Sequence, residues 1–200
     1  MGISDVKVLT ISDTNAASAT RLVTAARPDT SATMANTTHA SGEARNVTVT
    51  TAGTSDNAKT VTITGTDVFG DAMTEVITST SSAETVAGAK YFKTVTAAEC
   101  SAQYAGNVSV GSGSLCAQAV EGSNRLRLKG MSIVSGGTAG TVSFYNGAPE
   151  DGTVLFTART IGTANATVDR SIPSEGVLFD SGMVVQYTVD VTDMLTIFYA

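Results

Sequence analysis

The sequence predicts an all-β protein of two antiparallel β-sandwich or jelly-roll-like domains with an extended N-terminal segment. Two observations predict this class. Across residues 45–111 threonine alternates with valine or isoleucine, a period of two that gives a strand one apolar and one polar face. From residue 124 onward, short apolar runs recur roughly every 8–12 residues with Gly, Asn or Pro between them, as in sandwiches and barrels. We expect an N-terminal strand and arm over 1–44, a Thr-rich β-domain over 45–121 and a C-terminal β-sandwich or jelly-roll domain over 122–200.

The N-terminal segment begins with a predicted strand over residues 6–12. Residues 13–42 are rich in Ala, Thr, Ser and Asn and follow no clear period. Residues 16–26 have weak helical character, and a loop or an extended arm remains an equal alternative. Long irregular stretches are usually functional or wrap a neighbour. We therefore expect an arm between subunits, and deletion of residues 1–42 should weaken attachment to a partner without unfolding the domains.

The Thr-rich domain is predicted from four alternating runs, in which β-branched threonine favours strands and stays wettable without carrying charge. The runs cover residues 45–51, 59–64, 73–78 and 93–96. Turn residues separate them, and Gly70 can adopt the positive φ that a tight turn needs. After a last short strand at 106–111, the Gly and Ser content of residues 111–123 indicates a linker.

The C-terminal domain contains a basic row, Arg125, Arg127 and Lys129, which alternates with Leu126 and Leu128. On a strand, the three cations share one face while the two leucines enter the core. The row is either an ordinary solvated face or an electrostatic contact to an acidic partner surface. We take it as the first candidate for a docking face. The aromatic pairs at 144–145 and 198–199 should each place one ring in the core.

Composition narrows the classes of function. The chain is 42% hydrophobic but only 15% charged, against roughly 25% in typical soluble domains. This low charge suggests that part of the surface is buried against other subunits. A net charge of −6 argues against sequence-independent binding of nucleic acid, which needs clustered Lys and Arg. Neither an apolar run long enough to span a membrane nor a secretory signal is visible, so we expect synthesis without export.

Several motifs carry a resemblance to one class of proteins. Residues 65–78, Gly-Thr-Asp-Val-Phe-Gly-Asp-Ala-Met-Thr-Glu-Val-Ile-Thr, followed by 92–95 and 105–111, form a series that resembles virion proteins of tailed phages. Residues 140–145 and the closing run 195–199 resemble small β-sandwich modules of head-decoration and minor structural proteins. The resemblance covers most of the chain and implies a virion component, although its motifs describe strands and turns rather than a chemical site.

Catalytic chemistry is hard to build from these residues. His39 is the single histidine, lies in the irregular N-terminal stretch, and is expected to be an exposed loop residue. One His and two widely spaced Cys do not supply the usual zinc spacing, and no phosphate-binding loop or dinucleotide fingerprint is present. We expect no enzymatic activity, no cofactor and no bound metal.

Two further sets of residues were weighed for chemistry. Asp67, Asp71 and Glu75 flank a predicted turn and offer too few oxygen ligands for an obvious calcium site. Cys100 and Cys116 could form a disulfide if their strands were neighbours, and spacing alone does not decide it. In a reducing cytosol two free thiols are expected.

The expected function is therefore structural. The resemblance implies a capsid decoration or cement protein on the exterior of the head, assembled in the host cytoplasm. Its expected partners are the major capsid protein and two further copies of itself in a homotrimer, with neither nucleic acid nor membrane. The alternatives are a tail, neck or fibre-associated virion protein that binds host glycan, and a bacterial surface module with a true disulfide.

Overall fold

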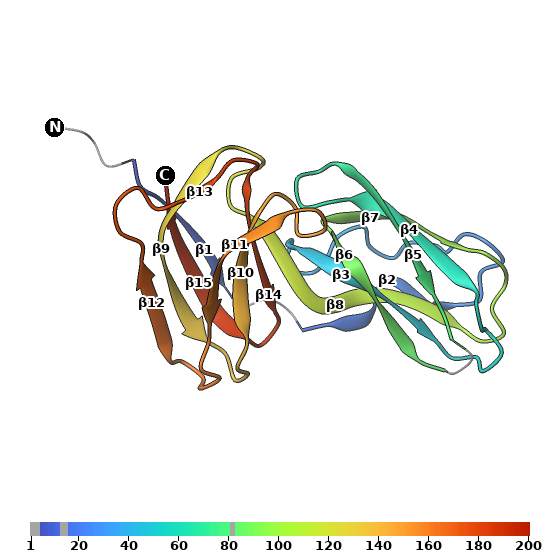
Figure 1. Ribbon diagram of the computed structural model, residues 1–200. Coiled ribbons are helices and arrows are strands. Elements are labelled where there is room, and N and C mark those ends of the chain that lie inside the picture. Colours follow the sequence, from blue (N-terminus) through green and yellow to red (C-terminus); the bar gives the residue numbers. More distant parts are fainter. Residues whose placement is uncertain (1–4, 13–15, 81–82) are drawn as a thin grey trace. The chain divides into compact units, whose positions relative to one another are not determined.

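The computed structural model describes residues 5–12, 16–80 and 83–200 (Figure 1). In these residues all fifteen named strands pair in antiparallel sheets, and the secondary structure includes no helix. No described helix therefore has the length and apolar character needed to cross a membrane. The predicted all-β class with antiparallel sandwich architecture is confirmed.

The chain divides into two compact units. One, the Thr-rich unit, is the continuous range Ala17–Cys116. The other, the C-terminal unit, combines Met1–Ala16 with Ala117–Ala200. Each unit is described separately below.

Two sheets form the Thr-rich unit. In the first, β8, β3 and β6 lie in that order, and β2 also pairs with β8. In the second, β4 lies between β5 and β7. The strands are β2 (Ser18–Ala26), β3 (Ala44–Thr51), β4 (Thr60–Thr66), β5 (Ala72–Thr78), β6 (Thr85–Phe92), β7 (Thr94–Cys100) and β8 (Val108–Ala119), of which only the first part belongs to this unit.

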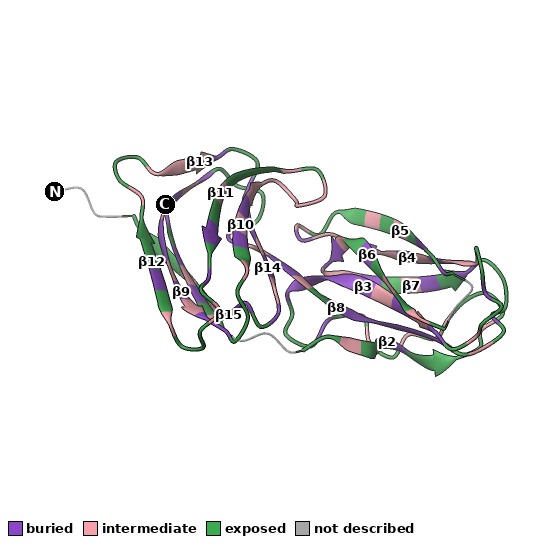
Figure 2. Cartoon of the chain, turned by 60° about the horizontal axis from the view of Figure 1, so that its bottom comes forward, coloured by how far each residue is buried: buried purple, intermediate pink, exposed green. Residues whose placement is uncertain are grey.

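The alternation read from the sequence decides which face of each strand is buried. In β4, Val61 and Ile63 are fully buried, while the threonines between them remain partly exposed. β3 is buried along most of its length, as Figure 2 shows in purple. The core combines apolar residues of both sheets: Leu22, Val23, Val47, Val49, Val61, Ile63, Ile77, Phe92, Val95, Ala98, Cys100, Tyr104, Val108 and Val110.

The N-terminal stretch is part of the units and not a separate arm. Residues 18–26, for which helix, loop and arm were open, form strand β2, and it pairs with β8. Residues 30–38 then lie beside β7, with isolated bridges from Ser31 to Glu99 and from Thr38 to Thr94, and a turn follows at residues 40–41. Leu22 and Val23 are almost fully buried. Their burial makes this stretch a component of the core.

The C-terminal unit also has two sheets. In one, the order is β1, β15, β9 and β12, with β13 paired to β9 as well. In the other, β10 lies between β11 and β14. The strands are β1 (Lys7–Ser12), β9 (Leu126–Ser135), β10 (Thr141–Asn146), β11 (Thr153–Arg159), β12 (Thr167–Ser171), β13 (Val177–Phe179), β14 (Met183–Thr188) and β15 (Thr192–Tyr199).

The units do not follow the ranges expected from the sequence. Strand β1 pairs with β15 over its whole length, from Lys7 opposite Tyr199 to Ser12 opposite Met194. The N-terminal strand therefore belongs with the last strand of the chain rather than with an arm over 1–44. Deletion of residues 1–42 would remove β1, β2 and buried core residues, so the structure does not support a removable arm.

The predicted linker at residues 111–123 is wrong, because most of it belongs to the long strand β8. Its glycines allow close approach rather than flexibility. A Cβ on Gly111 would lie 2.0 Å from the carbonyl oxygen of Ser18, and one on Gly113 would lie 2.1 Å from Oδ1 of Asn46. That Asn46 oxygen accepts the backbone N–H of Leu115 at 3.0 Å. Glycine was mistaken for a sign of a linker where the sheet needs bare backbone.

Candidate interaction surface

The basic row lies at the start of β9 in the C-terminal unit. Leu126 and Leu128 are buried, while Arg127 between them and Lys129 after them are partly exposed, and Arg125 just before the strand is exposed. The predicted alternation is thus confirmed. The pattern follows from the pleat, because β9 lies between β15 on one side and β12 and β13 on the other, with its apolar face in the core.

The cations of the row also make contacts within the chain. Arg125 Nε lies 3.2 Å from Asp180 Oδ1, and both side chains are about two-thirds exposed. The carbonyl oxygen of Glu175 accepts from Arg127 Nη1 at 3.3 Å and from Lys129 Nζ at 3.0 Å. The row therefore fastens the loop before β13 to β9. Its role in binding a partner stays a prediction.

A shallow open groove of about 530 Å³ lies next to the basic row, on the sheet formed by β15, β9 and β12. Its volume is within the usual range of roughly 300–1,000 Å³ for ligand pockets. The lining residues are Lys129, Gly130, Met131, Ser132, Asp169, Arg170, Ser171 and Phe198. Lys129 belongs to both the predicted row and the groove, whereas Arg125 and Arg127 do not line it.

The groove has an exposed apolar side. Phe198 is 36% exposed, and its neighbour in sequence, Tyr199, is 7% exposed. This difference confirms that one ring of the pair faces the core. Across the sheet, Phe198 pairs with Val8 of β1, which is 55% exposed. Two apolar side chains from neighbouring strands are therefore exposed side by side, and one of them, Phe198, lines the groove.

On the face that carries Phe198, the charged side chains of the groove are those of Lys129 and Asp169, whereas Arg170 lies opposite the buried Met131 and its side chain is on the other face of the sheet. Arg170 Nη1 donates a hydrogen bond to the backbone carbonyl of Asp169 at 3.0 Å. In the described part of the chain, the Arg170 guanidinium makes no ion pair within 4.0 Å. Sequence reasoning underrated Phe198. The only available signal was the alternation at 198–199, because the position of Phe198 beside the groove depends on the pairing of β15 with β9.

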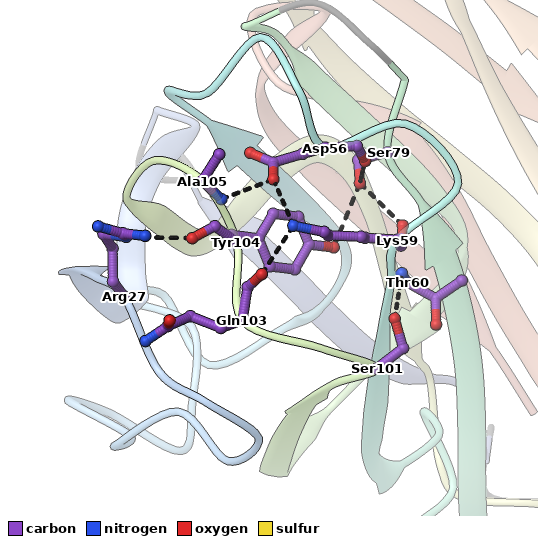
Figure 3. Close-up of polar contacts among 9 residues, drawn as sticks. All are labelled: Arg27, Asp56, Lys59, Thr60, Ser79, Ser101, Gln103, Tyr104 and Ala105. Atoms are coloured by element: carbon purple, nitrogen blue, oxygen red, sulfur yellow. Dashed lines mark hydrogen bonds and ion pairs between the residues drawn. The ribbon is translucent and has the colours of Figure 1, made fainter.

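A polar cluster in the Thr-rich unit has a structural role (Figure 3). Asp56 is fully buried, and its Oδ1 accepts from Lys59 Nζ at 2.9 Å and from the Ala105 N–H at 2.7 Å. Lys59 Nζ also donates to the Gln103 carbonyl at 2.7 Å and lies 5.4 Å from the Tyr104 ring centroid. Burial raises the pKa of the Asp56 carboxyl, but the Ala105 N–H and the Lys59 ammonium outweigh it, so the pKa is lowered.

His39 is buried, with 2% of its surface exposed, so the expectation of an exposed loop histidine is wrong. Its Nδ1 lies 2.7 Å from the hydroxyl of Ser112 on β8, which is also buried. Burial, together with the nearby Arg45 guanidinium and more weakly Arg21, lowers the His39 pKa to about 4, against an opposing hydrogen bond with the Phe92 backbone. A histidine and a serine that solvent cannot reach form a packing contact and not a catalytic pair.

The carboxylates that were weighed as metal ligands stabilise the backbone. Asp67 Oδ1 accepts the N–H groups of Phe69, Gly70 and Asp71 at 2.8–2.9 Å, which closes the turn between β4 and β5. Glu75 Oε1 accepts the Ala89 N–H at 2.6 Å and thereby joins β5 to β6. Within the described ranges, no three His, Cys, Asp or Glu residues are grouped so that they could hold a metal ion.

Cys100 and Cys116 are both buried and free, which confirms the expectation of two thiols. Burial raises the pKa of the Cys100 thiol, so it is poorly ionised at neutral pH. Neither thiol has the exposed, electropositive surroundings of a reactive cysteine.

Comparisons with known proteins identify no relative. No protein-family model matches the chain, and searches of curated proteins and of solved structures return no match. The functional argument therefore depends on the residues and their geometry.

Proposed function

We propose that this protein is a structural component of a tailed-phage particle and binds the outside of the capsid as a decoration or cement protein. The observation that carries the proposal is the chemistry of the exposed groove, where the apolar side chains of Phe198 and neighbouring Val8 lie on the same face of the sheet as Lys129. Such a surface suits association with another protein more than chemistry on a substrate. The resemblance of the Thr-rich motifs to virion proteins supports the same assignment.

The internal contacts of the charged residues also support a structural role. The buried carboxylate of Asp56 is engaged by Lys59 and a backbone N–H. The partly buried Lys129 binds the loop before β13. A coat protein needs rigidity and solubility, and hydroxyl-covered sheets supply both with few charges.

The mechanism would be additive. Each copy buries apolar and hydrogen-bonding surface across neighbouring subunits of the major capsid protein and so offsets the internal pressure of packaged DNA. A trimer would fit a symmetry axis of the shell, and three standard interfaces of roughly 1,600 Å² would give stable attachment. Assembly would take place in the host cytoplasm.

A second candidate is a tail, neck or fibre-associated protein that binds host glycan. One observation favours it, since a shallow groove with an exposed ring is a feature expected of a glycan-binding protein. Phe198 is the ring in this groove, and the sequence contains no tryptophan, which is the ring best suited to stacking on sugars. The capsid assignment therefore remains the proposal.

Copy number tests the proposal. Quantitative mass spectrometry of purified particles would compare this chain with the major capsid protein. Hundreds of copies per particle would support the capsid assignment, and a handful would support the tail. Particles prepared without this protein should release DNA at a lower temperature, and added purified protein should restore the original value. Absence of the chain from purified particles would refute both candidates.

A further inference from the structure

Strand β1 is an edge of its sheet in the C-terminal unit. Among the described strands it pairs with β15 alone, over six residues and without a bulge. Val8, Thr10 and Ser12 are exposed, and Val8 keeps 55% of its surface in solvent. An edge carries a row of backbone N–H and C=O groups without a partner strand, and such a row is a template for pairing with another strand.

The hydrogen bonds of the neighbouring strands show which residues of β1 direct their backbone groups outward. Ala200 exchanges two backbone hydrogen bonds with Arg127, at 2.7 and 3.0 Å, so Ala200 faces the β9 side. Residues of a strand face their two neighbours alternately, so Tyr199 and every second residue before it face β1 and meet its odd-numbered residues. The even-numbered residues of β1 therefore direct their N–H and C=O groups away from the sheet: Val8, Thr10 and Ser12.

The other edges of the two units are obstructed or short. Beside β7, residues 30–38 supply a partner, and the Ala32 N–H donates to the Ala98 carbonyl at 2.9 Å. Glu75 of β5 accepts the Ala89 N–H of β6 at 2.6 Å, which joins these two edges. Strands β2 and β11 pair with shifted registers, and β12 and β13 have five and three residues. These are the usual means by which proteins prevent pairing at edges, and within the described ranges β1 has neither a bulge nor a covering segment.

The residues of β1 also permit close approach of another strand. The charged residue of β1, Lys7, is its first residue, and Lys7 Nζ lies 2.7 Å from Glu121 Oε1. On the exposed face, Val8 lies beside Phe198, which is 36% exposed. A strand added at this edge would therefore meet apolar surface and an ion pair that is already formed.

Strand β1 is complementary to a second copy of itself. Directly opposite residues of an antiparallel pair point to the same face of a sheet, so a two-fold axis can pass through Leu9. In that register Val8 meets Thr10 of the second copy and Lys7 meets Ile11, so like charges are not opposite each other. The outward backbone groups of Val8 and Thr10 then exchange hydrogen bonds. This pairing closes two open edges at once, whereas a different partner would have to bring an open edge of its own.

From this geometry we infer that two copies of the chain pair through β1, antiparallel and edge to edge, so that their sheets become continuous. The inference goes beyond the proposed function, because the contact is two-fold and forms without a particle or a three-fold axis. The paired strands are short, and the contact is smaller than a standard interface. We therefore expect weak association, with a Kd on the order of 10 µM.

The test is sedimentation equilibrium of the full-length protein between about 1 and about 500 µM, with hydrogen exchange followed by NMR at both concentrations. We expect an equilibrium between monomer and dimer. At the higher concentration, exchange of the Val8 and Thr10 amides should slow by about fivefold or more. The amides of β11, an edge of the other sheet of the same unit, should exchange at the same rate at both concentrations.

Two variants locate the contact. Thr10→Pro removes an outward N–H and keeps the bonds of its neighbours to β15, since proline is tolerated where the N–H of an edge strand faces solvent. Val8→Lys adds one cation per copy on the same face near the axis. Each variant should weaken dimerisation by about tenfold or more. Val154→Lys is the matched control, because Val154 is 43% exposed on β11, and it should dimerise like the unmodified protein.

Amide spectra would verify the fold of each variant, and the exposed Val8 position tests the contact even if Thr10→Pro does not fold. A protein that stays monomeric at about 500 µM would overturn the inference. Dimerisation of unchanged affinity in Val8→Lys would do the same, because the contact would then lie elsewhere. Failure of the proposed function would look different, since particles would lack the chain while the purified chain still paired through β1.

Discussion

Acid should destabilise the Thr-rich unit through one residue, His39. It is the single histidine of the chain, and its pKa is lowered from 6.5 to about 4 by burial and by the nearby Arg45 and Arg21 guanidinium groups. A base with a lowered pKa in the folded state binds protons more readily when unfolded. Stability is therefore full above pH 6.5 and falls as the pH drops toward 4.

The size of the loss follows from the two pKa values. Between pH 7.5 and pH 5, linkage gives a loss of about 2 kcal/mol in the free energy of unfolding, which grows to about 3 kcal/mol near pH 4. Asp56 contributes in a separate window, because its lowered pKa costs stability only as the pH falls below about 4. The range from pH 7.5 to 5 therefore isolates His39.

The assay is urea unfolding of the full-length protein at several pH values, with hydrogen exchange and mass spectrometry to distinguish the two units. Loss of protection on acidification should be confined to Ala17–Cys116. The His39→Gln variant should have lower stability at pH 7.5 but an almost flat profile. A change below about 0.5 kcal/mol from pH 7.5 to 5 in the unmodified protein, or a His39 pKa near 6.5 by NMR, would refute the reasoning.

The remaining predictions concern buried groups and the N-terminal segment. Lys59→Met should cost about 3 kcal/mol in urea unfolding, because it leaves the fully buried Asp56 carboxylate without its ammonium partner. Asp56→Ala should cost less, since the Lys59 side chain left behind is 25% exposed, and equal costs would contradict this. Cys100 and Cys116 should resist Ellman's reagent in the native protein and both react in denaturant, so fast native reaction would count against their burial. Deletion of residues 1–42 should abolish folding, since net stability is only about 5–15 kcal/mol, and normal exchange protection in the truncated chain would disprove it.

The fold class could be predicted because the local alternation of apolar and polar residues shows which face of each strand is buried. Val61 and Ile63 alternate with threonine, and Leu126 and Leu128 alternate with cations, so a period of two was enough to identify both faces. The boundaries of the units could not be predicted in the same way. Pairing of β1 with β15 joins the two ends of the chain, and no local pattern encodes that contact.

The burial of polar residues and the close approach of backbones were also not predicted from the sequence. Both depend on contacts between residues that are far apart in the chain. His39 looked like a loop histidine because its partner Ser112 lies on β8, far along the chain. Gly111 and Gly113 suggested flexibility, although the facing Ser18 carbonyl and Asn46 side chain leave no room for a Cβ. Composition alone cannot distinguish a glycine in a flexible segment from a glycine whose missing Cβ lets a neighbouring strand approach closely.

The basic row shows why a surface needs the fold before its role can be assigned. In the sequence, Arg125, Arg127 and Lys129 look equivalent. In the structure, Arg125 contacts Asp180 and Arg127 contacts the Glu175 carbonyl, whereas Lys129 contacts that carbonyl and also lines the groove. The pairing of β12 with β9 places Asp169 opposite Ser132 on this surface, whereas Arg170 lies opposite the buried Met131 on the other face. A charge contributes to docking where its internal contacts leave it available beside exposed apolar surface. Of the three cations in the row, Lys129 is the one beside the exposed Phe198, so residues that look equivalent in the sequence are not equivalent at the surface.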